Sequence, residues 1–226
     1  MKPASALAVI GMLLALAPDA GAWSNGTDGC NSFGTHDWVL KKAIKAAGSE
    51  ASWVRGGVAL RATDDPDCKD GIDHASGTWW HVYDRWGDEW GGADEATIVW
   101  FRRTSRRLEA GRKRAASRAL GIMSHFVADV ANPMHTDQSD KEEPIHSPYE
   151  SDVDERIPNY RFRYDGRDAG KPGATTRRVA RRAHRYYWNL VNAYDAHGYN
   201  AKVHRITKRQ LKRAANALTD LLTAIR

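Results

Sequence analysis

Two stretches of the sequence place histidines and carboxylates at spacings that suit a metal ion. In the first, His125 and Asp129 are four residues apart, and His135 follows an Asn-Pro pair. In the second, His146 and Glu150 are again four residues apart. Residues i and i+4 lie on one face of a helix, so each pair can point at one ion. Imidazole nitrogens and carboxylate oxygens are ligands that zinc accepts.

Each of these residues also has an ordinary structural interpretation. An isolated His-x3-Asp pair is most often a satisfied pair, and SPYE at residues 147–150 is a good helix capping box with proline at the first helical position. Metal binding is favoured because the five side chains fall together within residues 125–150. Two more histidines extend the pattern: His36 at a predicted helix start, and His81 behind an Asp-rich loop.

The segments that must position these residues have helical periodicity. Helices are predicted at residues 36–47, 93–110, 113–131 and 176–196, with a final helix that opens with a capping box at Thr207 and Gln210. Ordered loops are predicted at residues 64–77 and 132–147, and the least regular segment at 163–175. Because no period-2 alternation is evident, we expect an all-α fold with a single multi-helix domain.

The N-terminus has the pattern of a secretory signal peptide. Lys2 precedes an apolar segment at residues 6–17, which is too short to span a bilayer, and Ala20-Gly21-Ala22 resembles a cleavage site. An uncleaved anchor is the alternative. We predict a signal peptide at residues 1–22, cleavage before Trp23, a catalytic domain at 23–226 and a secreted or periplasmic location.

The chain is basic, with 34 Lys and Arg against 28 Asp and Glu and a formal charge of +6. This balance favours an anionic partner, either nucleic acid or an anionic lipid surface. Basic runs at residues 102–118 and 177–185 are either solvated helix faces or surfaces that dock phosphate groups. Whether Cys30 and Cys68 form a disulfide is left open by the sequence.

Taken together, the motifs resemble those of the zinc-dependent phospholipase C family and, more distantly, of its S1/P1-type nuclease relatives. The matching pieces, in family order, are Trp23, THDWVLKKAI at 35–44, the Asp-rich loop at 64–70, HVYD at 81–84, HFVADVANPMH at 125–135 and HSPYE at 146–150. The resemblance spans residues 23–150, whereas residues 151–226 share only helical character. It implies a helical domain of the phospholipase C/P1 nuclease type with three zinc ions in a cleft.

The resemblance also implies a ligand set. It assigns Trp23, through its amino nitrogen and carbonyl oxygen, to a first zinc ion, together with His36 and Asp129. It assigns His81, His125, Asp129 and an upstream aspartate to a second, and His135, His146 and Glu150 to a third. For the upstream aspartate, Asp67 after Pro66 fits best and Asp65 is the fallback, whereas Asp64 and Asp70 are expected to be turn formers.

The implied chemistry is phosphodiester hydrolysis by a zinc-activated hydroxide, with Asp129 shared by two ions and Asp67 steering or deprotonating the water. A phospholipase C would release diacylglycerol and a phosphorylated headgroup. Glu150 and the HVYD motif favour this activity, whereas the basic charge favours the alternative, an S1/P1-type single-strand nuclease. A third hypothesis is an exported helical binding protein with structural zinc. No obligate protein partner is evident, and we expect a monomer.

Four aromatic residues near these motifs suit either substrate. They could enclose a choline group by cation–π contact or stack on a base. Packing in the core is the first expectation for Trp79 and Trp80. The other two are Tyr83 and Tyr149.

Overall fold

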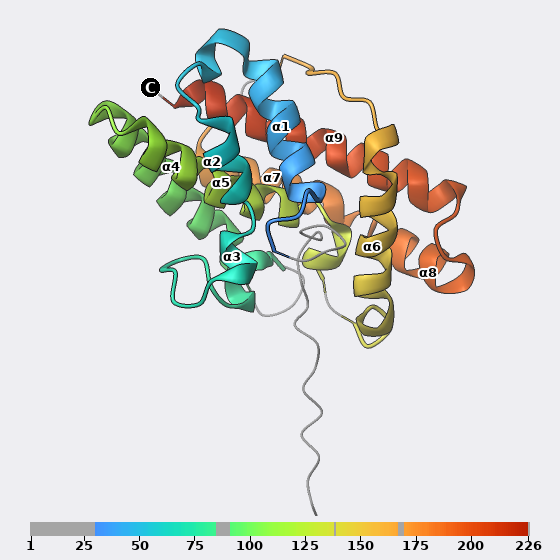
Figure 1. Ribbon diagram of the computed structural model, residues 1–226. Coiled ribbons are helices and arrows are strands. Elements are labelled where there is room, and N and C mark those ends of the chain that lie inside the picture. Colours follow the sequence, from blue (N-terminus) through green and yellow to red (C-terminus); the bar gives the residue numbers. More distant parts are fainter. Residues whose placement is uncertain (1–29, 85–90, 138, 167–169, 226) are drawn as a thin grey trace, which may run out of the picture.

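The structure, a computed structural model, describes residues 30–84, 91–137, 139–166 and 170–225, and these ranges contain helices and loops but no strand (Figure 1). The α-helices are α1 (Thr35–Ala47), α2 (Gly56–Arg61), α3 (Asp65–Cys68), α4 (Ala93–Glu109), α5 (Lys113–Asp129), α6 (His146–Arg156), α7 (Pro172–His184), α8 (Tyr187–His197) and α9 (Ala201–Ala224). Short 3₁₀ turns are η1 (Gly48–Ala51), η2 (Thr78–His81), η3 (Pro133–His135), η4 (Glu143–Ile145) and η5 (Ile157–Asn159). The predicted all-α, single-domain fold is confirmed.

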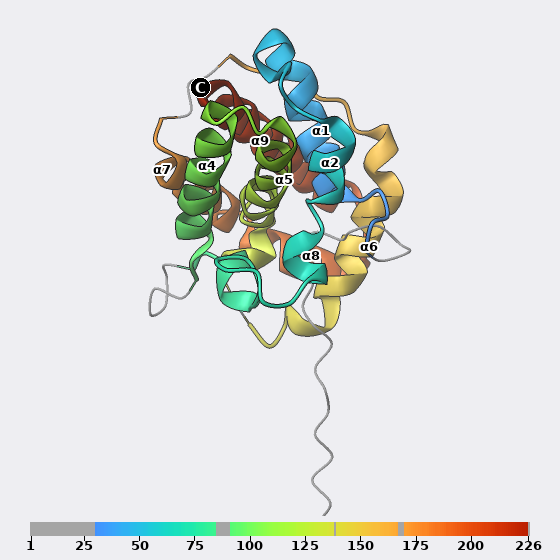
Figure 2. The same cartoon turned by 60° about the vertical axis from the view of Figure 1, so that its left-hand side comes forward.

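Helix α5 is the centre of the domain. It packs against α4, α2, α1 and α9, and Figure 2 shows α4 and α5 side by side. Every residue from Ala119 to Thr136 is buried. A helix that is enclosed on all sides is expected to be apolar. His125 and Asp129 are therefore ionisable groups in the interior, where each must have a partner.

A glycine on α5 allows α2 to approach closely. A Cβ atom at Gly121 would lie 2.2 Å from the carbonyl oxygen of Ala59 and 2.8 Å from the Cβ of Ala62. Glycine is the residue that tolerates such proximity. The close contact brings the end of α2, and the start of α3 beyond it, next to the His125 turn of α5.

The predicted helix at 176–196 is wrong in its continuity, because the chain forms α7 and α8 with a break at residues 185–186. The sequence there has no glycine or proline to indicate a break. Tertiary contacts account for it: both helices pack against α9 and η3, but α7 also packs against α4, whereas α8 packs against η4. Tyr186 at the break lies under the guanidinium groups of Arg209 and Arg213. Tyr187 is buried, and its hydroxyl donates to Ser139.

The predicted start of the last helix is also wrong. Helix α9 begins at Ala201, and the side chain of Asn200 caps it by accepting from the backbone of Lys202 and Val203. Thr207 lies inside the helix, where its hydroxyl bonds to the carbonyl of Val203. Asn200 is one of the residue types that cap helices well, so its position was available in the sequence.

A disulfide joins the segment before α1 to the last residue of α3. It links Cys30 to Cys68 and resolves the question that the sequence left open. No helix in the described part of the chain is both long and apolar enough to cross a membrane. The predicted signal peptide, its cleavage site and Trp23 lie outside the described residues.

Candidate metal centre

Five of the predicted site residues meet at the buried end of α5. We call His36, Asp67, His81, His125 and Asp129 the α5 cluster; they come from α1, α3, η2 and α5. The ring nitrogens His81 Nδ1 and His125 Nε2 are 2.9 Å apart. Asp67 Oδ1 lies 3.4 Å from the first nitrogen and 3.3 Å from the second. The cluster is therefore small enough for its atoms to share ions.

The carboxylate of Asp129 faces two groups of ligand atoms at once. Its Oδ1 lies 3.4 Å from His36 Nε2. Its Oδ2 lies 3.0 Å from His81 Nδ1 and 3.1 Å from His125 Nε2. The two oxygens of this carboxylate therefore face different histidines.

Backbone carbonyls orient the histidines of this region. His125 Nδ1 donates to the carbonyl of Thr63 at 2.7 Å, and His81 Nε2 donates to that of Ala75 at 3.1 Å. Each bond places a proton on the outer nitrogen and turns the inner nitrogen toward the cluster, where it would present a lone pair once any proton there is displaced. His36 differs, because neither of its buried ring nitrogens has a hydrogen-bond partner among the described residues.

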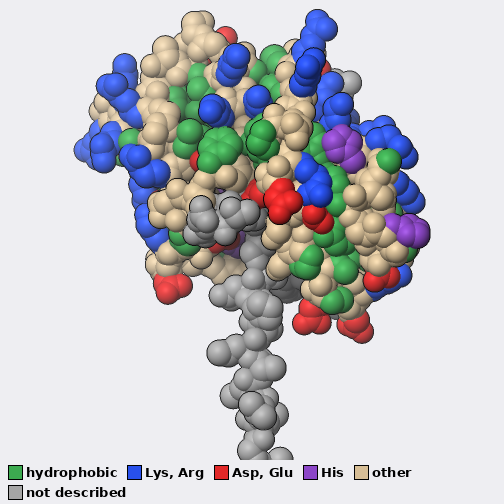
Figure 3. Space-filling model, turned by 45° about the vertical axis from the view of Figure 1, so that its right-hand side comes forward, with side chains coloured by type: hydrophobic (Ala, Val, Ile, Leu, Met, Phe, Trp, Pro, Cys, Tyr) green, Lys and Arg blue, Asp and Glu red, His purple; other side chains and the backbone are tan. Residues whose placement is uncertain are grey.

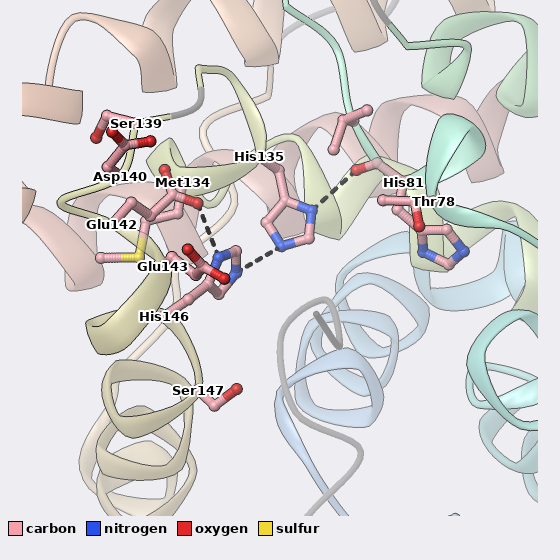
Figure 4. Close-up of a pocket in the computed structure, with 11 residues that line it drawn as sticks. Thr78, His81, Met134, His135, Ser139, Asp140, Glu142, Glu143, His146 and Ser147 are labelled. Atoms are coloured by element: carbon pink, nitrogen blue, oxygen red, sulfur yellow. Dashed lines mark hydrogen bonds and ion pairs between the residues drawn. The ribbon is translucent and has the colours of Figure 1, made fainter. Parts of the chain in front are cut away.

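A second group, the α6 cluster, consists of His135, His146 and Glu150. His146 Nε2 lies 3.2 Å from His135 Nε2 and 3.0 Å from Glu150 Oε1. Figure 4 shows the two imidazoles pointing toward one another. His135 Nδ1 donates to the carbonyl of His81 at 2.9 Å, which connects this group to the α5 cluster.

Two residues of this region were missed from the sequence. Asn132, interpreted only as a helix stop, donates its amide to Glu150 Oε1 at 3.0 Å. Glu142 is buried, and its Oε1 accepts from His146 Nδ1 at 2.8 Å. Glu142 precedes His146 by four residues, the same spacing that identified the other pairs, so the sequence did contain this signal. The capping box at 147–150 does not form, since α6 begins at His146 without a side-chain cap.

The structure separates the candidate upstream aspartates. Asp67 points into the α5 cluster, whereas Asp65 forms ion pairs with Lys69 and Arg118 outside it. Asp64 accepts from the backbone amide of Asn31. Of the predicted site residues, Asp65 is the one described side chain that the structure places outside both clusters.

Burial and neighbouring charges shift the pKa values in these clusters. Burial, reinforced by His125, lowers the pKa of His36 to about 3, which keeps its ring neutral. Burial would raise the pKa of Asp129, but His125 and His81 reverse this and lower it. Burial would lower the pKa of His146, but Glu150 and Glu142 raise it to about 10. A cation entering the α6 cluster therefore displaces a proton.

A cavity of about 340 Å³ opens beside the α6 cluster (Figure 4). His81, His135 and His146 form part of its wall. Three carboxylate side chains also line it, and none of its described lining residues is Lys or Arg; the three are Asp140, Glu142 and Glu143. The cavity thus combines access to the ligand atoms with negative charge.

The aromatic residues considered for substrate binding have different environments. Tyr83 and Tyr149 are buried, and the hydroxyl of Tyr149 lies 2.9 Å from that of Thr207. Trp80 is half-buried against the core, as expected. The expectation of packing is wrong for Trp79, whose side chain is 43% exposed, since η2 directs it outward at the residue before Trp80.

The two basic runs lie on different helices. Residues 102–118 cover the second half of α4 and the start of α5, and residues 177–185 lie on α7 and the break after it. A groove of about 520 Å³ lies between α7 and α9. Its cationic lining residues are Arg178, Arg182, Arg209, Lys212 and Arg213. On the face shown in Figure 3, Lys and Arg lie mainly along the upper, left and right margins, and Asp and Glu at the centre and lower edge.

Comparisons with known proteins identify the fold. No family model matches the chain, and no curated protein matches it significantly. Among solved structures, it is similar to the alpha-toxin of Clostridium perfringens from an avian strain, at 14% identity, and to the alpha-toxin of Clostridium absonum, at 16%. Both superpositions have a TM-score of 0.65 and cover 85% of this chain but 62% of the toxin. At this identity the likeness establishes a shared fold.

Proposed function

We propose that the protein is a secreted zinc-dependent phosphodiesterase, and that it acts on glycerophospholipids as a phospholipase C. One observation carries the proposal: eight predicted ligand residues, separated by up to 114 positions in the chain, converge in two adjoining clusters, and all of them except Asp67 are buried. The motif resemblance to zinc-dependent phospholipases C and the fold shared with the two alpha-toxins support it.

The chemistry of the donor atoms fits zinc. With the outer nitrogens of His81 and His125 donating to carbonyls, their inner nitrogens face each other and the carboxylate of Asp129 as acceptors. Asp129 Oδ1 is buried and has no hydrogen-bond partner within the described part of the chain. Acceptors gathered in this way repel one another unless a proton or a cation lies between them. Neutral imidazoles and carboxylates match zinc in ligand type.

When bound, zinc lowers the pKa of a coordinated water and offsets the charge that develops on phosphoryl oxygens. The chain's own residues do the rest. The carboxylate of Asp129 lies between His36 on one side and His81 and His125 on the other. The carbonyls of Thr63 and Ala75 orient the rings of His125 and His81. Asp67 Oδ1 is placed to accept a proton from the attacking water.

A lipid headgroup suits the cavity beside the α6 cluster better than a polynucleotide does. Its carboxylates attract the ammonium end of a zwitterionic headgroup and repel a chain of phosphates. The cavity adjoins His135 and His146, so a headgroup held there would leave its phosphate near the proposed ions.

One observation favours the nuclease alternative. The groove between α7 and α9 presents five cationic side chains, and such grooves follow nucleic acid backbones. It shares no lining residue with the cavity at the α6 cluster. A nuclease would therefore bind the nucleic acid in this groove but cleave it at the cavity beside the α6 cluster, which is separate and lined by carboxylates. Because negative charge at that cavity repels phosphates, the nuclease is the second candidate.

A paired assay on secreted protein that begins at Trp23 tests these proposals. With zinc present, phosphocholine release from phosphatidylcholine and nucleotide release from single-stranded DNA or RNA are followed in parallel, and zinc per chain is measured. A chelator and an Asp129→Asn variant serve as controls. We expect lipid cleavage that both controls abolish.

The other outcomes have definite meanings. Cleavage of nucleic acid alone would replace the phospholipase proposal with the nuclease one. Zinc near one ion per chain without cleavage of either substrate would contradict both and favour a binding protein with structural zinc.

A further inference from the structure

The side chain of Glu142 occupies a buried position behind the α6 cluster. It lies just before η4, is 6% exposed, and its Oε1 accepts from His146 Nδ1 at 2.8 Å. In Figure 4 it lies on the side of His146 away from His135. Glu142 therefore contacts the outer nitrogen of a proposed ligand while the inner nitrogen faces the cluster.

The partner of this outer nitrogen distinguishes His146 from its neighbours. The outer nitrogens of His81, His125 and His135 each donate to a backbone carbonyl. That of His146 donates to a carboxylate instead. A carboxylate orients an imidazole as a carbonyl does, and in addition it makes the ring a stronger electron donor to an ion.

Without Glu142, each cluster supplies one carboxylate for each proposed ion, and Glu142 raises this ratio at the α6 cluster. The α5 cluster has the carboxylates of Asp67 and Asp129 for the two ions proposed there. The α6 cluster has only Glu150 for one divalent ion. Glu142 adds a second negative charge at hydrogen-bond distance from a ligand ring, so that carboxylates balance the charge of the ion.

We propose that Glu142 is a positioning residue that holds His146 in its ligand orientation and retains the zinc ion of the α6 cluster. The proposal rests on the proposed function, because it assumes zinc at His135, His146 and Glu150. Glu142 does not itself join the ligand set. It acts through the bond to His146, and its removal should release this ion selectively.

The test is zinc retention by the full secreted chain, measured by competition with a chelator and by zinc content. In Glu142→Ala we expect the affinity of one ion to fall about 10–100-fold, with the other two retained. In Glu142→Gln the amide oxygen can still accept from His146, so a smaller loss is expected. Glu143→Ala is the matched control, because it removes an exposed neighbouring carboxylate from the same cavity.

Three outcomes would overturn the proposal. The first is a wild-type affinity for all ions in Glu142→Ala. The second is an equal loss in Glu143→Ala, which would show that general negative charge is responsible. The third is an equal loss in Glu142→Gln and Glu142→Ala, which would exclude the hydrogen bond as the cause.

Folding and metal binding are separated within the same experiment. If Glu142→Ala is not secreted as a folded protein by circular dichroism, Glu142→Leu, which fills the site without offering an acceptor to His146, takes its place, and wild-type zinc affinity there overturns the proposal. An unsubstituted protein that binds no zinc at the α6 cluster would instead contradict the proposed function.

Discussion

The α5 cluster and the α6 cluster offer similar atoms but are built in opposite ways. The α5 cluster gathers residues 36–129 from four elements, and backbone carbonyls orient the rings of His81 and His125. The α6 cluster comes from residues 135–150, and a carboxylate orients one of its rings. One requires the complete domain, whereas the other is assembled from neighbouring residues.

This difference predicts unequal consequences of mutation. In the α5 cluster one proposed ligand, Asp129, serves two ions, so changing it should affect both ions together. In the α6 cluster all the proposed ligands bind the same zinc ion, so a change should remove that ion and leave the other two in place. Zinc counts per chain, measured beside activity, can therefore distinguish the clusters.

The largest effect is expected from Asp129→Asn. The amide cannot replace a carboxylate whose two oxygens face different ligand groups, so two ions should be lost. We expect kcat/KM to fall more than about a thousandfold, or ~4 kcal/mol. Zinc content and lipid hydrolysis are measured, with the exposed Asp73→Asn as the control. Retention of both ions with near wild-type turnover would contradict the sharing of Asp129.

Next in size is Asp67→Asn, compared with Asp65→Asn. Asp67 points into the α5 cluster, so its loss should lower kcat/KM about a hundredfold, or ~3 kcal/mol. Asp65 pairs with Lys69 and Arg118 outside the cluster, so its substitution should cost about 1–2 kcal/mol of stability and leave zinc in place. Kinetics and thermal unfolding measure the two. The opposite result would transfer the ligand role to Asp65.

A smaller loss is expected from an extra residue before Trp23. Both ring nitrogens of His36 are buried without a hydrogen-bond partner among the described residues, so this part of the α5 cluster depends on a further group. An added residue displaces the amino nitrogen, and we expect weaker zinc binding with activity lower by about thirtyfold, or ~2 kcal/mol. The same residue added at the C-terminus is the control. Unchanged zinc stoichiometry would exclude the N-terminus as a ligand.

The smallest of the four effects is expected from Glu150→Gln. The change weakens only the α6 cluster, so one ion should be lost while two remain, and activity should fall about tenfold, or ~1.4 kcal/mol. Zinc content at increasing chelator concentration provides the measurement. Loss of all three ions at once would show that the clusters bind cooperatively, against the contrast drawn here.

The same contrast explains what the sequence could predict. The i, i+4 pairs of the α6 region and of α5 were visible because helical periodicity alone places them together. The contact of Asp67 with His125 was not visible in the sequence. Asp65 and Asp67 both lie in the short helix α3, and only the structure shows which of the two side chains points toward His125. Motif resemblance favoured Asp67, whose carboxylate lies within reach of His81 and His125, and its role as a ligand stays a prediction.

Helix boundaries were also predictable where a local sequence signal marks them and unpredictable where tertiary contacts determine them. Gly48 and the Asn132-Pro133 pair are local signals, and the helices before them end within three residues of the predicted positions. The break between α7 and α8 has no local signal, because it depends on the contacts of Tyr186 and Tyr187 with other elements. Glu142 was overlooked although it precedes His146 by four residues, since this spacing does not by itself show that the two side chains are hydrogen-bonded.

The disulfide between Cys30 and Cys68 makes the proposed N-terminal ligand a tethered one. Cys68 directly follows Asp67, so cleavage before Trp23 would leave a free amino group roughly seven residues, or at most about 25 Å of extended chain, from a point fixed beside the α5 cluster. A short tether gives a ligand an effective concentration on the order of millimolar without any added contact. Export, signal cleavage and oxidation would then act as successive steps of metal-site assembly, and reduction would lengthen the tether and loosen the ion.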